Sequence, residues 1–91
     1  MEQQHRNEKQ IEVAVYTTAG RYPTTGFETE QTNQKIAVVL GRAARALHIS
    51  QTDQWVARAN GNELAPHASY AESGLSGQVT IDFGPRESGG G

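Results

Sequence analysis

The chain has 91 residues, a formal net charge of −2 at pH 7 and no cysteine. A chain of this length forms one small domain, and so mild a charge gives no reason to expect a nucleic acid or an anionic membrane as partner. The lack of cysteine excludes disulfides, thiolate metal sites and a cysteine nucleophile. No apolar stretch is long enough to span a bilayer, and the first residues lack the hydrophobic segment of a signal peptide, so we expect a cytoplasmic protein.

Residues 1–9 are polar and charged throughout, without apolar periodicity. We interpret them as a mobile N-terminal arm, because such a segment has no apolar surface to bury. The alternative is that this arm becomes ordered on a partner or on a neighbouring copy of the chain.

A hairpin is predicted next. Residues 11–16 alternate apolar and polar side chains, which is the period of a half-buried strand. Gly20 supplies the positive φ of a short turn. Residues 22–30 are extended again, and Pro23 and Gly26 indicate an edge strand with a bulge, since proline cannot donate a ladder hydrogen bond.

A helix follows the hairpin. Residues 34–48 place apolar side chains in steps of three and four, which predicts one apolar stripe facing a sheet. Either Thr32 or Asn33 would cap its first turn by accepting a free backbone N–H. Gly41 lies in the middle of this helix, where either close packing against the sheet or a mild weakness of the helix would explain it.

The C-terminal half returns to strands. Residues 54–60 form a predicted strand, and Asn60 and Gly61 give the strongest hairpin signal in the chain, with a short strand after them. Residues 68–75 predict a short helical turn that ends at a glycine. Residues 79–83 alternate apolar and polar side chains and close the sheet.

The candidate core residues are the large apolar side chains at the inward positions of these elements. They are Ile11, Val13, Val15, Phe27, Ile36, Val39, Leu40, Leu47, Trp55, Leu64, Leu75, Val79, Ile81 and Phe83. The order of the elements predicts an α+β domain in which the first and last strands lie together at the sheet centre and the helix covers one face.

The last eight residues, 84–91, are mostly small or polar and end in three glycines. Fully extended, they reach at most roughly 28 Å, and glycine lets the backbone pass close to another protein because it lacks a Cβ. We therefore divide the chain into an arm (1–9), a folded body (10–83) and a glycine-ended tail (84–91). The same tail composition is also typical of a linker or a frayed end.

Residues 10–91 resemble ubiquitin and its relatives. Residues 18–21 fall where ubiquitin has its first Thr-Gly-Lys turn, residues 59–64 look like the segment Phe-Ala-Gly-Lys-Gln-Leu, and residues 69–75 replace the loop Thr-Leu-Ser-Asp-Tyr-Asn-Ile. The resemblance implies a ubiquitin-like β-grasp fold, with a mixed sheet of four to five strands packed on one helix. Among these relatives the chain looks most like bacterial modifiers encoded beside their own enzymes, some of them in antiviral operons.

That resemblance implies a protein modifier rather than an enzyme. An E1-like enzyme would use ATP to adenylate the carboxylate of Gly91, the covalent attachment residue, and pass it as a thioester to an E2-like enzyme and then to a target protein. A deconjugating protease would reverse the attachment, and the chain itself would hold no cofactor. The tail residues that these enzymes would recognise are Arg86, Glu87, Ser88, Gly89 and Gly90.

The chain departs from ubiquitin on the expected docking surface. Aligned through Leu64, the centre of ubiquitin's apolar patch corresponds to Arg58, and the outward position of the last strand carries Asp82. Proteins that read ubiquitin's apolar face should therefore bind this chain poorly. Only Lys9 and Lys35 are available for lysine-linked chains.

The residues themselves offer no catalytic or metal constellation, since His5, His48 and His67 are scattered and no nucleophile has a site spacing. Two hypotheses stand beside the modifier. One is a sulfur carrier, activated at a similar glycine end as a thiocarboxylate. The other is a non-covalent β-grasp interaction module whose glycines are incidental. The polar arm and the long tail favour the modifier.

Overall fold

The computed structural model of this chain describes residues 9–86. Its elements, in chain order, are β1 (Gln10–Thr17), β2 (Gly20–Tyr22), β3 (Glu28–Gln31), α1 (Ile36–Ala46), β4 (Trp55–Ala59), β5 (Asn62–Leu64) and β6 (Gly77–Pro85). A helix and a mixed sheet confirm the α+β prediction. Within this described part, no helix is long and apolar enough to cross a membrane.

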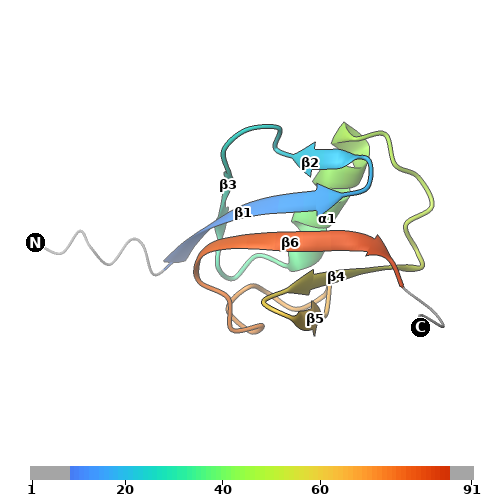
Figure 1. The fold of residues 1–91 in the computed structure, drawn as a ribbon. Helices are drawn as coiled ribbons and strands as arrows, with labels where there is room; N and C mark the ends of the chain where they lie inside the picture. The colour runs from blue at the N-terminus through green and yellow to red at the C-terminus, as the bar shows by residue number, and fades with distance from the viewer. Residues whose placement is uncertain (1–8, 87–91) are drawn as a thin grey trace, which may run out of the picture.

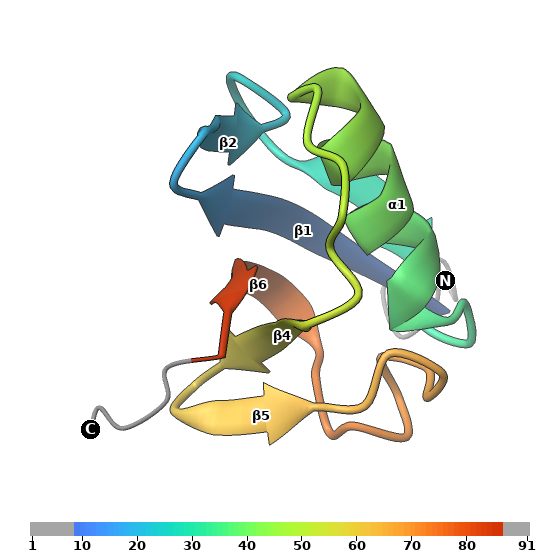
Figure 2. The same cartoon turned by 90° about the vertical axis from the view of Figure 1, so that its right-hand side faces the viewer.

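The strands form one sheet in the order β2-β1-β6-β4-β5, and β3 also pairs with β1. β1 and β6 are parallel and lie at the centre, whereas the other pairs are antiparallel. Figure 1 shows β1 and β6 side by side, and Figure 2 shows α1 lying across one face of the sheet. The predicted central position of the first and last strands is thus confirmed. Both strands contribute alternating apolar side chains to the helix-covered face, which favours that position.

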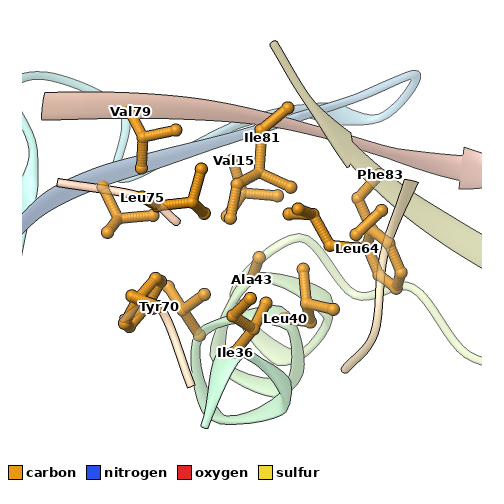
Figure 3. Close-up of a cluster of buried hydrophobic side chains, with 14 of the residues drawn as sticks. Val15, Ile36, Leu40, Ala43, Leu64, Tyr70, Leu75, Val79, Ile81 and Phe83 are labelled. Atoms are coloured by element: carbon orange, nitrogen blue, oxygen red, sulfur yellow. The ribbon is translucent and has the colours of Figure 1, made fainter. Parts of the chain in front are cut away.

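The core lies between the sheet and α1. The fully or nearly buried apolar residues are Ile11, Val13, Ala14, Val15, Ile36, Val39, Leu40, Ala43, Ala57, Ala59, Leu64, Tyr70, Leu75, Val79, Ile81 and Phe83. Figure 3 shows Val15, Val79 and Ile81 on the sheet side, facing Ile36, Ala43 and Tyr70. Each large apolar side chain buried in this way contributes about 1.5–3 kcal/mol.

The predicted core omitted one large buried side chain and included three that are only partly buried. Tyr70 is fully buried although it was not among the candidates, because it lies in an irregular segment without a readable period. Phe27, Leu47 and Trp55 are only half-buried, and Trp55 packs against the core from outside it. Phe27 and Leu47 lie at the margin of the sheet and helix, where Leu47 already follows the end of α1.

The predicted second strand, residues 22–30, is in fact two strands. Tyr22 pairs with Val15 and Glu28 pairs with Val13, so the five residues 23–27 lie between two pairs that are separated on β1 by one residue. Pro23 has no N–H for the ladder, and Gly26 adopts a left-handed φ of 71°. The split explains why the sheet has six strands rather than the predicted four to five.

The helix is shorter than predicted and begins differently. It starts after Lys35, which makes no side-chain capping hydrogen bond, so the expected cap by Thr32 or Asn33 was wrong. Instead, the N–H groups of Ile36 and Ala37 donate to backbone carbonyl oxygens of the segment before Tyr70, at 3.0 and 2.8 Å. The free N–H groups of the first helical turn therefore find their acceptors in a distant part of the chain. These hydrogen bonds hold α1 against the connection between β5 and β6.

The remaining local signals were read correctly. Asn60 and Gly61 have φ values of 55° and 81°, as a tight hairpin turn between β4 and β5 requires. Ser69 and Glu72 exchange hydrogen bonds of 2.9 and 3.0 Å in a capping box that starts the predicted helical turn. Gly74 ends that turn with a φ of 76°.

Close packing does not explain the glycine at position 41 of the helix. A Cβ built at this position would meet nothing within 4 Å, and the residue is exposed on α1. No neighbour within the described chain requires a glycine here, so the reading that remains is a mild weakness of the helix.

Candidate functional site

The last strand extends further than its apolar pattern indicated. β6 continues beyond Phe83 to Pro85, and its last two residues, Gly84 and Pro85, are cross-strand partners of Val56 and Trp55 on β4. The Trp55 ring packs edge-on against Phe83, with ring centroids 5.1 Å apart. The folded body therefore holds the chain as far as Pro85.

Arg86, the first residue after β6, is held on the surface by two contacts. Its backbone N–H donates to the carbonyl oxygen of Gln54 at 3.4 Å. Its guanidinium donates from Nη2 to Oε2 of Glu63 at 2.8 Å and from Nη1 to Oε1 at 3.4 Å. Both side chains are largely solvated, with relative exposures of 57% and 44%. The predicted recognition residue is thus already paired with an acid on β5.

The other predicted tail residues, Glu87, Ser88, Gly89, Gly90 and Gly91, lie outside the described residues. Their roles in enzyme recognition and covalent attachment stay predictions. What the structure supplies is the point from which they depart, which is the end of β6, beside β4 and β5.

The predicted docking residues are neighbours in a row that crosses five strands. Glu63 of β5, Arg58 of β4, Asp82 of β6, Tyr16 of β1 and Arg21 of β2 are successive cross-strand partners. Their side chains alternate with the buried ones along each strand, so the row lies on the sheet face opposite α1. This face presents alternating charges and one aromatic ring.

Arg58 and Asp82 are exposed and available to a partner. The ion pairs within residues 9–86 involve only Arg42 and Arg86 as cations, although Arg58 has an acidic residue opposite it on both sides. A hollow of about 310 Å³ opens beside them, lined also by Tyr16, Val56 and Gly84. The two predicted residues are therefore brought together with their charges unpaired within the described chain.

The β2 end of this face carries an aromatic and cationic cluster that the sequence pattern did not reveal. The guanidinium carbon of Arg21 lies 5.4 Å from the ring centre of Tyr16 and 5.2 Å from that of Phe27. Nη1 of Arg21 also donates to the carbonyl oxygen of Pro23 at 2.7 Å. Tyr16 remains 45% exposed. Cation–π stacking orients these side chains at the β2 end of this sheet face.

A second polar cluster lies on the helix side of the sheet, where it connects α1 to β3 and stabilises the fold. Nη1 of Arg42 on α1 lies 2.8 Å from Oε2 of Glu30 and 3.7 Å from Oε1 of Glu28, both on β3. The hydroxyl of Tyr22 donates to Glu28 at 3.2 Å, and burial together with the Glu28 charge raises the pKa of this phenol. Burial also raises the pKa of Tyr70 far above its ordinary value, and its hydroxyl has no hydrogen-bond partner.

The described residues offer nothing that resembles a metal or catalytic centre. Among residues 9–86 no three His, Asp or Glu side chains are grouped to hold a metal ion. His48 and His67 are exposed on different connections, after α1 and after β5. What the arrangement offers chemically is a polar, charged sheet face and the root of a glycine-ended chain.

No protein-family model and no curated protein matches this chain. Solved structures do match its fold. A protein designed de novo on the basis of ubiquitin superposes with a TM-score of 0.68 and 24% identity, over 91% of this chain and 96% of that one. Caldiarchaeum subterraneum ubiquitin superposes with a TM-score of 0.61 and 12% identity, over 89% and 99%.

A chain of the pParkin–pUb–UbcH7 complex also matches, with a TM-score of 0.60 and 18% identity, over 82% of this chain and 22% of that one. At these identities the likeness shows the fold alone. The fold is a ubiquitin-like β-grasp, which confirms the expectation drawn from the sequence.

Proposed function

We propose that this chain, whose fold is ubiquitin-like, is a protein modifier that is attached to target proteins through the carboxylate of Gly91. The observation that carries the proposal is the exit of β6. This strand leaves the centre of the sheet, is paired as far as Pro85, and is followed by Arg86 at the surface. The five residues that remain, 87–91, end in three glycines. In the proposal, these residues carry the acyl terminus, and the paired end of β6 is the point where they are attached to the folded body.

The proposed chemistry is supplied by other proteins. The α-carboxyl group has a pKa near 3.3–3.7, so it is ionised at neutral pH and can act as a nucleophile. Its oxygen attacks the α-phosphorus of ATP held by an E1-like enzyme, and pyrophosphate leaves. A cysteine thiolate then attacks the acyl carbon and AMP leaves, giving a thioester. An amine or hydroxyl of the target finally displaces the thiolate.

The proposed docking surface for these enzymes is the sheet face around Arg58 and Asp82. Both residues are exposed and have no ion pair within residues 9–86. Complementary charges on a partner would steer association and set specificity more than they would add affinity. Such a surface favours dedicated enzymes over ones that read an apolar ubiquitin face.

The cellular setting belongs to the same proposal. Ubiquitin of Caldiarchaeum subterraneum and a chain of the pParkin–pUb–UbcH7 complex share the fold, which supports protein partners of the kind that act with ubiquitin. The E1-like and E2-like enzymes follow from the resemblance drawn from the sequence. A deconjugating protease would complete the cycle. We place the system in the cytoplasm of a bacterium, with its enzymes encoded beside this chain and with a role in antiviral defence, following the resemblance drawn from the sequence.

Mass spectrometry after incubation with ATP and the E1-like and E2-like enzymes encoded beside this chain tests the proposal. We expect adducts in which Gly91 is joined to a target, and their loss when Gly90 and Gly91 are deleted. A stable species in which one oxygen is replaced by sulfur would instead identify a sulfur carrier. An unchanged mass, with partner binding that survives the deletion, would identify a non-covalent interaction module.

A further inference from the structure

Arg86, the root of the tail, is anchored to the body at two points, one through its backbone and one through its side chain. The backbone N–H of Arg86 donates to Gln54, just before β4, and its guanidinium meets both carboxylate oxygens of Glu63 on β5. Two parallel N–H···O contacts restrict the orientation of a guanidinium more than a single contact does. Arg86 is therefore held in a defined orientation on the surface of the body.

Two arginines, Arg58 and Arg86, lie near Glu63, and only one of them forms an ion pair with it. Arg58 is its cross-strand partner on β4, yet the ion pair of Glu63 is with Arg86, 23 positions further along the chain. The Glu63 carboxylate thus contacts Arg86 and leaves Arg58 without an ion pair in the described part of the chain, free to meet a partner. Glu63 therefore lies between the proposed docking surface around Arg58 and the start of the tail at Arg86.

β6 is paired with β4 as far as Pro85, but the side chains of the two residues before Arg86 add little restraint on Arg86 itself. Gly84 has no side chain, and a Cβ placed there would meet nothing within 4 Å. Pro85 is exposed and has no N–H of its own. Without Glu63, Arg86 would be held by a single backbone hydrogen bond of 3.4 Å, which is at the long end for such a contact.

We infer that Glu63 is a positioning residue for activation: by holding Arg86 it fixes the origin and direction of residues 87–91 for entry into the activating enzyme. The inference rests on the proposed function. Five residues reach at most roughly 18 Å from Arg86, so the direction in which they start decides where Gly91 arrives. Fixing that direction before binding raises the fraction of molecules ready to bind.

The size of the effect follows from the exposure of the pair. An exposed ion pair shifts the equilibrium between its paired and open states by about two- to five-fold. The contact with Glu63 therefore favours the anchored position of Arg86, yet it opens readily when an enzyme binds Arg86. A bias of this kind acts on binding and not on the chemical step. Loss of Glu63 should therefore raise KM for this chain about two- to five-fold and leave kcat unchanged.

The test compares Glu63→Gln with Glu12→Gln in the full chain. The control removes the same charge from an exposed residue of β1 that pairs with β3 and β6, away from the tail root. One measurement is ATP–pyrophosphate exchange by the E1-like enzyme encoded beside this chain, as KM and kcat at low and high salt. The other needs no enzyme: amide hydrogen exchange of Arg86 by NMR.

We expect Glu63→Gln to raise KM two- to five-fold at low salt and to speed exchange at Arg86, while Glu12→Gln changes neither. High salt should bring the KM of the natural chain toward that of Glu63→Gln, because screening weakens the pair. An unchanged KM, or a fall in kcat instead, would overturn the inference while the proposed function stands. If the natural chain is not activated at all, the proposed function fails. The hydrogen-exchange measurement then still tests the positioning role, and an unchanged exchange rate at Arg86 in Glu63→Gln would overturn it.

Discussion

Arg42 on α1 and Glu30 on β3 form the one ion pair of the described chain in which an acid is buried. Nη1 of Arg42 lies 2.8 Å from Oε2 of Glu30, whose side chain is 3% exposed. A carboxylate removed from water needs a close opposite charge to remain ionised at low cost. This contact therefore allows β3 to carry an acid on the face that packs toward the helix.

Arg42→Ala should destabilise the fold by leaving Glu30 without its cation. Truncating one partner of a fully buried pair costs about 3–5 kcal/mol. Because Arg42 is itself 43% exposed, water will replace part of the contact, and we expect about 1–3 kcal/mol. Urea denaturation measures the loss. Arg45→Ala, on the last turn of α1, should change stability by no more than about 0.5 kcal/mol, and an equal effect of both would contradict the role of the pair.

Tyr70→Phe should leave the fold as stable as before, or more stable by about 1 kcal/mol. The hydroxyl of Tyr70 is buried without a hydrogen-bond partner, so removing it relieves the cost of an unsatisfied polar group. Tyr22→Phe is the matched change, and it should destabilise because the Tyr22 hydroxyl donates to Glu28. Thermal unfolding of the two variants checks the opposite signs, and a clear loss at Tyr70→Phe would refute this view of the hydroxyl.

Stability should decline in alkaline solution because of the same tyrosine. Burial, followed by the nearby Glu30 charge, raises the pKa of Tyr70 in the folded protein above its unfolded value of 10.0. The folded state therefore holds the phenolic proton more tightly, and this stabilisation is complete below about pH 10 and is lost as the pH rises further. Urea midpoints measured between pH 8 and pH 11, roughly spanning that point, should fall less steeply for Tyr70→Phe.

Gly41→Ala should stabilise the protein by about 0.5–1 kcal/mol, because alanine is the better helix former and an added Cβ meets nothing within 4 Å. Gly61→Ala provides the contrast. At a φ of 81° it should destabilise by about 1–2 kcal/mol, since only glycine adopts that backbone easily. Differential scanning calorimetry distinguishes the two, and a destabilised Gly41→Ala would mean that the exposed helix face is constrained.

Arg58→Glu should slow association with the activating enzyme by about tenfold at low salt, and the difference should shrink as salt is added. Reversing the charge in the middle of the row removes the complementarity that steers encounter. Arg45→Glu makes the same charge change on the helix side and should leave the association rate nearly unchanged. Stopped-flow binding gives both rates. Equal slowing by the two variants would indicate an effect of net charge rather than of this face.

Much of the fold was readable from local patterns. The alternation in residues 11–16 and 79–83 predicted two half-buried strands, and the helical stripe correctly named Ile36, Val39 and Leu40 as core. Asn60 and Gly61 predicted the hairpin because few other residues accept positive φ. These features were predictable because neighbouring residues alone set them.

Other parts of the fold depended on distant segments. The cap of α1 comes from backbone carbonyls near residue 68, which no side-chain pattern around Thr32 could indicate. Tyr70 is buried because its irregular segment folds against the helix, although the segment itself has no period. The division of residues 22–30 into β2 and β3 likewise depends on how each piece pairs with β1.

The site divides in the same way. The sequence by itself determined that Arg58 and Asp82 alternate with buried neighbours and so face outward, since a strand repeats every two residues. Only the tertiary structure decided that they are cross-strand partners and that Glu63 pairs with Arg86 rather than with Arg58. The register of separate strands sets these contacts, and register follows from the packing of the whole sheet against α1 rather than from any one segment.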